Sequence, residues 1–406
     1  MSKSGRSLIS RIVEFYIEHS SHSTKNIVAN NKVWQEYLAE SAKENELEYK
    51  IPVKLSSPVV SRTDTVQTYT MPVYTLNPQS SALPHVLYIH GGSCIKHISS
   101  YHWKMLDTIA QSTKVEITVP IYPVAPIHTY IEATALIEDL YRRMVSQYGA
   151  DNIIMMGDSA GGGIAACMCQ YFAKLGLNQP LKLILLSPCV DATLENPDIK
   201  EYEEVDPMLT PKLFNAGIPW VGEDYSNLLD KAPENSRLRT AEHSAIFGDL
   251  SVLRNVTSFV GTHEIFYPDV AKFHQKLLEA GVNSRLIVGE GMNHVWPCYP
   301  IPEARDAIKT ICTLILEPVS NSTTGESSSS TSAETAQSDC QTSPETTEEE
   351  RAPKETDIPE NVPKEEHQES GETIQEQKDE QPQTTSEIQQ ETPTEDAAKP
   401  PKAQDQ

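Results

Sequence analysis

A glycine-flanked serine near the middle of the chain has the pattern of a catalytic nucleophile. Residues 157–161 read Gly-Asp-Ser-Ala-Gly, with Ser159 at the centre. The four residues before this turn are apolar, which predicts a buried strand, and the Ala-rich segment after it predicts a helix. A strand, a tight turn and a helix would expose the serine hydroxyl, and the two glycines would let neighbouring backbone approach closely. We therefore expect Ser159 to be a nucleophile.

Such a serine needs a base that accepts its proton and an acid that orients the base. His294 ends the glycine-containing segment 289–294 directly after the last predicted strand, and we expect it to be the base. Two acids compete for the third position. Glu264 follows the end of a predicted strand, from which a carboxylate could reach the imidazole. Asp269 heads the next helix, where its interaction with the helix N-terminus is a sufficient explanation. We favour Glu264 and keep Asp269 as the second choice.

The hydrolysis of an ester or amide also needs donors for the oxyanion. His90-Gly91-Gly92 follows another predicted strand. We expect the backbone N–H groups of Gly91 and Gly92, with that of Ala160, to form the oxyanion hole. His90 is expected to brace this loop, and Asp158 to brace the serine turn, without transferring protons.

Strands and helices alternate through the middle of the chain, which predicts a mostly parallel sheet with helices on both faces. The predicted strands are 49–55, 69–76, 85–89, 115–120, 152–157, 181–186, 257–260 and 284–288. The predicted helices are 101–112, 130–148, 160–175, 269–280 and 303–316.

The regions outside this alternation predict a cap. Apolar residues recur at helical spacing within residues 1–48, which predicts helices that pack on the body, cover the site or contact a lipid surface. Within the catalytic domain, residues 49–316, the irregular stretch 187–244 predicts a cap or lid insertion, with short helical pieces at 211–216 and near 227–231.

Charge is concentrated at the end of the chain. Of the net charge of −24, about −17 belongs to residues 317–406, which contain no aromatic residue. A segment with so few apolar side chains cannot offset the entropy of folding, so we predict a disordered acidic tail. The remainder is mildly acidic, which gives no indication of nucleic-acid binding.

The cysteines and the N-terminal segment bear on location. The seven cysteines are odd in number and suggest no local disulfide, which favours reduced thiols and a cytoplasmic protein. Charged residues interrupt the N-terminal apolar positions, so we expect neither a secretory signal nor a transmembrane segment. His243 and His263 lie at no metal-ligand spacing, and we predict no metal and no cofactor.

The motifs together resemble those of the hormone-sensitive-lipase-like family of α/β-hydrolases. The resemblance covers about residues 85–316 and rests on HGG, GDSAGGG, SPCVD at 187–191, GTHEIFYPD and GMNH. It implies an α/β-hydrolase fold with an N-terminal helical cap, and carboxylesterase or lipase activity. Two positions depart from the family pattern: Ser93 stands where a third glycine is usual, and Glu264 where most members have Asp.

These observations favour a serine carboxylesterase that hydrolyses short- to medium-chain acyl esters of small molecules. The alternative is a non-catalytic protein on the same scaffold that binds a small molecule or a partner. The two hypotheses differ in whether Ser159 turns substrate over.

Overall fold

The computed structural model describes residues 6–19 and 23–319. The chain divides into two units, 1–325 and 326–406, and all described residues belong to the first. The predicted disordered tail therefore lies outside the described residues, apart from 317–319. The proposed division into cap segment, catalytic domain and tail stays a prediction.

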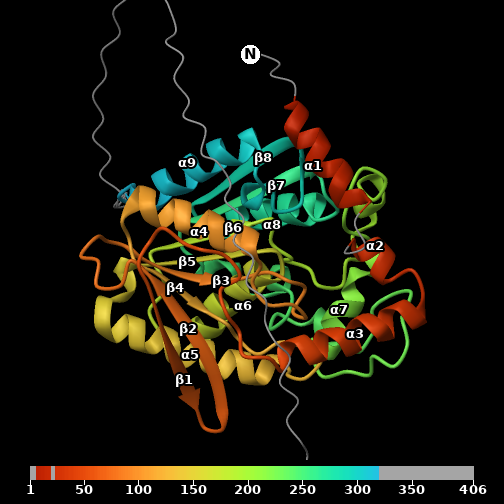
Figure 1. Ribbon diagram of the computed structural model, residues 1–406, viewed down its shortest axis with the longest axis horizontal. Helices are drawn as coiled ribbons and strands as arrows, with labels where there is room; N and C mark the ends of the chain where they lie inside the picture. Colours follow the sequence, from red (N-terminus) through yellow and green to blue (C-terminus); the bar gives the residue numbers. More distant parts are fainter. Residues whose placement is uncertain (1–5, 20–22, 320–406) are drawn as a thin grey trace, which may run out of the picture. The chain divides into compact units, whose positions relative to one another are not determined.

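A single eight-stranded sheet forms the centre of the described unit (Figure 1). Its spatial order is β1-β2-β4-β3-β5-β6-β7-β8. The pairs β1–β2 and β2–β4 are antiparallel, and all other neighbouring strands of the sheet are parallel. The strands are β1 (Val59–Val66), β2 (Tyr69–Leu76), β3 (His85–Ile89), β4 (Ile117–Pro120), β5 (Ile153–Asp158), β6 (Lys182–Leu186), β7 (Val256–His263) and β8 (Ser284–Asn293). The predicted mostly parallel sheet is confirmed.

Helices cover both faces of this sheet. The α-helices are α1 (Leu8–Glu18), α2 (Thr24–Ile27), α3 (Asn31–Asn45), α4 (Ser100–Thr113), α5 (Tyr130–Tyr148), α6 (Ser159–Lys174), α7 (Phe214–Trp220), α8 (Tyr267–Glu279) and α9 (Pro302–Leu316). Helices α4 and α9 pack on the face that contains Tyr88 and Met156. Helices α5, α6 and α8 pack on the face that contains Leu87 and Met155. Because neighbouring residues of one strand enter two different cores, the central strands are apolar throughout.

The cap regions contact one another at the carboxyl ends of the strands. Apart from α7, the insertion contains 3₁₀ turns at Pro197–Glu201, Pro211–Leu213 and Arg237–Arg239. The side chain of Gln35 in α3 donates to the backbone oxygen of Tyr225 at 2.9 Å, and Thr24 at the start of α2 donates to that of Met208. The N-terminal helices and the insertion therefore pack against each other, as parts of a single cap would.

Two sequence-based predictions of local structure are wrong. Residues 49–55 form no strand; their alternating apolar residues pack against the core as an extended segment, which gives a strand-like pattern without a strand partner. The edge strand is β1 instead, whose residues are mostly polar and exposed. Residues 227–231 form no helix but an irregular segment with bends, in which the backbone N–H and carbonyl of Leu229 are both hydrogen-bonded to the side-chain amide of Asn215.

No helix within residues 6–19 and 23–319 has the length and apolar character that crossing a membrane requires.

Candidate active site

Ser159 occupies the turn between β5 and α6. Its φ angle is 52°, in the left-handed region that a non-glycine residue seldom adopts. The turn is crowded: a Cβ on Gly157 would lie 2.6 Å from the carbonyl oxygen of Gly161 and 2.8 Å from that of Ile89. A Cβ on Gly161 would collide with the carbonyl oxygens of Ile89 and His90. The glycines at 157 and 161 are therefore required for close approach, as their pattern predicted.

Three side chains from separate strand ends meet at this turn. The Oγ of Ser159 lies 2.9 Å from Nε2 of His294, and Nδ1 of His294 lies 2.6 Å from Oε2 of Glu264. A carboxylate only accepts hydrogen bonds, so Nδ1 carries the proton and Nε2 is free to accept from the serine hydroxyl. Glu264 follows β7 directly, and His294 follows β8 directly. All three side chains are buried.

The second oxygen of Glu264 is also held. Its Oε1 accepts from the backbone N–H of Gly261 at 2.5 Å and from the hydroxyl of Ser187 at 2.8 Å. The same hydroxyl accepts from the N–H of Val295 at 3.0 Å, next to the histidine. Ser187 thus connects the acid to the loop that carries the base. The sequence assigned Ser187 no role beyond its place in the SPCVD segment, which follows β6.

Asp269, the second-choice acid, has another partner. Its Oδ1 accepts from the side-chain amide of Asn196 at 2.8 Å, and its Oδ2 has no hydrogen-bond partner among the described residues. Burial raises the pKa of Asp269 to about 7. The carboxyl in hydrogen-bond contact with the imidazole is that of Glu264.

Asp158 braces the loop that follows β3. Its Oδ1 accepts from the N–H of Gly91 at 2.8 Å and from the hydroxyl of Tyr88 at 2.5 Å, and its Oδ2 lies 3.0 Å from Nε2 of His102. Burial acts to raise the pKa of Asp158, but the charge of His102 and these hydrogen bonds hold it below its ordinary value. The Gly91 N–H, which the sequence suggested as an oxyanion donor, therefore donates to Asp158 in this structure.

The next two residues of this loop offer free donors. Gly92 and Ser93 have φ angles of 124° and 55°, so the backbone turns sharply beside Ser159. Within the described part of the chain, the N–H groups of Gly92, Ser93 and Ala160 donate to no acceptor. Successive free N–H groups in such a turn form a concave site for negative charge. The sequence did not indicate Ser93 as a donor, since the pairing of Gly91 with Asp158 depends on the fold.

His90 lies where a structural residue would be expected. Its Nδ1 donates to the carbonyl oxygen of Gly91 at 2.7 Å, and its ring stacks on that of Tyr122 at 4.3 Å. Burial lowers the pKa of His90 to about 3, so the ring is neutral. These contacts fit a brace for the loop.

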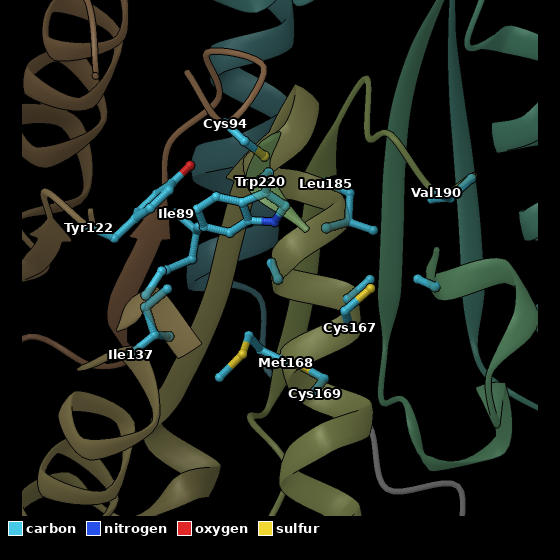
Figure 2. Packing of buried hydrophobic residues seen from close by; sticks show 14 of the residues in the cluster. Ile89, Cys94, Tyr122, Ile137, Cys167, Met168, Cys169, Leu185, Val190 and Trp220 are labelled. Atoms are coloured by element: carbon cyan, nitrogen blue, oxygen red, sulfur yellow. The ribbon is translucent and has the colours of Figure 1, made fainter. Parts of the chain in front are cut away.

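A cavity with about 620 Å³ of empty space opens beside Ser159. Its walls are mostly apolar and come from the loop after β3, from α6, from α7 and from the insertion. They include Cys94, Ile164, Cys167, Leu194, Leu213, Phe214, Trp220, Leu238 and Phe266. Figure 2 shows the side chains of Cys94, Cys167 and Trp220, which line the cavity, among the packed residues of the hydrophobic core. The six described cysteines are all free thiols, and no cluster of His, Cys, Asp or Glu in the described residues could hold a metal ion.

Comparison with known proteins identifies the family to which this fold and site belong. The model of a family with the alpha/beta hydrolase fold matches residues 86–298, just over half of the chain. An esterase from Acinetobacter venetianus is 28% identical over 239 residues, which cover 58% of this chain and 76% of that protein. A triacylglycerol lipase from Mycobacterium tuberculosis is 32% identical over 145 residues, covering 34% of this chain and 32% of the lipase.

Solved structures agree with the family match. A Staphylococcus aureus protein thought to be an esterase superposes with a TM-score of 0.65 at 29% identity, covering 72% of this chain and 95% of that one. An esterase of the bacterial hormone-sensitive lipase family shares the fold, with a TM-score of 0.60 at 20% identity over 77% of this chain and 99% of that one. The predicted resemblance is confirmed: the chain belongs to the α/β-hydrolase family and is a carboxylic ester hydrolase of the esterase and lipase type.

Proposed function

We propose that the protein is a serine carboxylesterase for short- to medium-chain acyl esters, with Ser159, His294 and Glu264 as its catalytic triad. The observation that carries this proposal is the unbroken pair of hydrogen bonds from the serine hydroxyl through the imidazole to the buried carboxylate, at 2.9 and 2.6 Å. These are the distances at which a base can take the proton of a nucleophile.

The proposed reaction proceeds in two halves. Nε2 of His294 accepts the proton of Ser159 as Oγ attacks the ester carbonyl, and the imidazolium then protonates the leaving alkoxide. A water molecule, deprotonated by the same nitrogen, attacks the acyl-enzyme and releases the carboxylic acid. Glu264 holds the imidazole in its productive tautomer and stabilises the transient imidazolium through both halves.

The oxyanion of each tetrahedral intermediate needs donors close to Ser159. We assign these donors to the N–H groups of Gly92, Ser93 and Ala160. Gly91 is left out because its N–H donates to Asp158 at 2.8 Å, which positions the loop instead. Losing one such donor typically lowers kcat by about 10²–10³-fold.

The proposed substrate class follows from the cavity. Its mostly apolar wall would contact an acyl chain, as the walls of small-molecule sites contact their ligands. Trp220 and Phe214 of α7 contribute large side chains to this wall, and we propose that they restrict the site to short and medium chains.

Hydrolysis of a series of p-nitrophenyl esters, from acetate to palmitate, tests the proposal. We expect turnover by the wild type with an optimum at short or medium chains, and loss of turnover in Ser159→Ala. Ser251→Ala is a matched control, because Ser251 is exposed and remote from the triad. Equal turnover by Ser159→Ala would overturn the assignment of the nucleophile. If no ester is hydrolysed, the binding-protein alternative would replace the proposal.

A further inference from the structure

Helix α1 is attached to the body mainly through its polar side, although Val13 also packs against the core. The backbone N–H and the hydroxyl of Ser7 both donate to Glu303 of α9, at 2.6 and 2.9 Å. Glu14 forms an ion pair with Arg6 and a hydrogen bond with Nδ1 of His263 at 2.9 Å. Ser10, on the same side of the helix, is buried. Figure 1 shows α1 beside α9, in agreement with these contacts.

The opposite side of α1 is apolar and exposed. Five large side chains are 47–72% exposed, and we call them the α1 stripe: Leu8, Ile9, Ile12, Phe15 and Tyr16. Residues three, four and seven apart lie on one side of a helix, so these five side chains form a continuous surface. A helix on a globular protein usually buries such a surface against the core. In α1, by contrast, these five apolar side chains face away from the core.

The α1 stripe continues into a groove beside the catalytic loops. The groove contains about 1060 Å³ of empty space and is lined by Val13, Tyr16, Ile17, Tyr101, Met208 and Tyr299. Tyr16 belongs to both the stripe and the groove.

The wall of the groove that contains Met208 is connected by hydrogen bonds to the residue next to Glu264. The N–H of Met208 donates to Oδ1 of Asp206, and Oδ2 of the same carboxylate accepts from the N–H of Ile265, both within 2.9 Å. Ile265 follows Glu264, the proposed catalytic acid, directly in the chain. One wall of the groove is therefore connected through Asp206 to the segment that carries Glu264, in a protein that hydrolyses carboxylic esters.

We propose that the α1 stripe is a contact surface for an uncharged or zwitterionic lipid layer, which the protein touches through α1 while the groove faces the layer. An amphipathic helix that lies in an interface exposes this kind of apolar face and keeps its polar side toward the protein or water. The stripe itself contains no charged residue, and the exposed neighbours Arg11 and Glu18 have opposite charges.

The charge of the protein selects the kind of lipid. Residues 1–316 carry a net charge of about −7, and the whole chain carries −24. Anionic lipid would be repelled, since attraction to it requires clustered Lys and Arg. The binding free energy must then come from burial of the apolar stripe, which a phosphatidylcholine layer allows.

Flotation with phosphatidylcholine vesicles tests this proposal. We expect the wild type to float with the vesicles and the double variant Ile12→Glu/Phe15→Glu to lose at least about tenfold in vesicle affinity, because two charges would enter the lipid interface. Leu278→Glu is a matched control, since Leu278 on α8 is 47% exposed, as Ile12 is. The control should float like the wild type. The melting temperatures of all variants establish that each one folds.

Two further measurements make the outcome unambiguous. The flotation is repeated with Ser159→Ala, which lacks the proposed nucleophile, so that lipid binding is measured without hydrolysis. The result of this test therefore does not depend on whether the proposed triad is correct. Gel filtration of the wild type and the double variant reports the oligomeric state. Absence of wild-type flotation, or equal flotation of wild type and double variant, would overturn the proposal. A wild-type dimer that the double variant converts to a monomer would identify the stripe as an interface between copies and would also overturn it.

Discussion

Oε2 of Glu264 and Nδ1 of His294 lie 2.6 Å apart in a site that excludes solvent from both groups. The carboxylate comes from the residue that directly follows β7, so the strand end fixes its position. Asp269 lies five residues further on and pairs with Asn196 instead. The geometry therefore separates two acids that the sequence places within one short segment.

The two acids should differ strongly in their effect on catalysis. Glu264→Gln should lower kcat by about 10²–10⁴-fold, because an amide no longer fixes the productive tautomer of His294 or stabilises its charged form. Asp269→Asn keeps the bond to Asn196 and should change kcat by less than about threefold, as is usual for a group outside the reacting set. Both values are measured on p-nitrophenyl butyrate. The opposite ranking would transfer the acid role to Asp269.

Ser187 should contribute to the rate without contacting substrate. Ser187→Ala removes the donor to Oε1 of Glu264 and the acceptor for the Val295 N–H, and leaves that N–H buried and unpaired. We expect a loss in kcat of about tenfold, corresponding to roughly 1.4 kcal/mol, with KM nearly unchanged. Ser258→Ala is the control, because Ser258 is equally buried and its hydroxyl has no partner among the described residues. Equal kcat in both variants would contradict the positioning role.

The chemistry was predictable because it lies in short motifs at the ends of strands. Gly-Asp-Ser-Ala-Gly, the residue after β7 and the residue after β8 each take their position from one local element, and a parallel sheet brings strand ends together. Ser187 is also at a strand end, but a single serine after a strand carries no chemical signal of its own.

Features that depend on long-range pairing were not predictable. The pairing of the Gly91 N–H with Asp158, 67 residues away, is one such feature, and the HGG motif alone gave no sign of it. The alternation of apolar and polar residues at 49–55 indicates that one side of the segment is buried, but it does not indicate whether a neighbouring strand pairs with it. The periodicity of α1 identified an amphipathic helix, but its orientation depends on Glu303, 296 residues from Ser7, and on His263, 249 residues from Glu14.

The free energy of unfolding should depend on pH because of the buried carboxyl of Asp269. Burial raises the pKa of this group to about 7 in the folded state, well above its value in an unfolded chain. Between these two values the folded state binds more protons, so the free energy of unfolding falls as pH rises from about 4 to about 7. Asp269→Asn removes this dependence.

The stabilisation expected from Asp269→Asn, measured as the increase in the free energy of unfolding over the wild type, is therefore larger at high pH. The free energy of unfolding of the variant, relative to that of the wild type, should rise by about 1–3 kcal/mol between pH 5 and pH 8. Denaturant titrations of both proteins at the two pH values measure this difference. A difference that does not change with pH would show that Asp269 is ionised throughout.

The length of acyl chain that the enzyme prefers should respond to Ile164, which lines the cavity from α6, one helical turn and a half beyond Ser159. We expect Ile164→Ala to lengthen the space available to the acyl chain of the substrate and Ile164→Phe to shorten it. Burying one more methylene contributes about 0.8 kcal/mol, so the ratio of kcat/KM for octanoate to that for butyrate should rise about 3–10-fold in the first variant and fall in the second. Leu175→Ala, at the exposed end of the same helix, should leave the ratio unchanged. If the ratio moves the same way in both Ile164 variants, the acyl chain does not lie in this cavity, and the groove beside α1 becomes the site to examine.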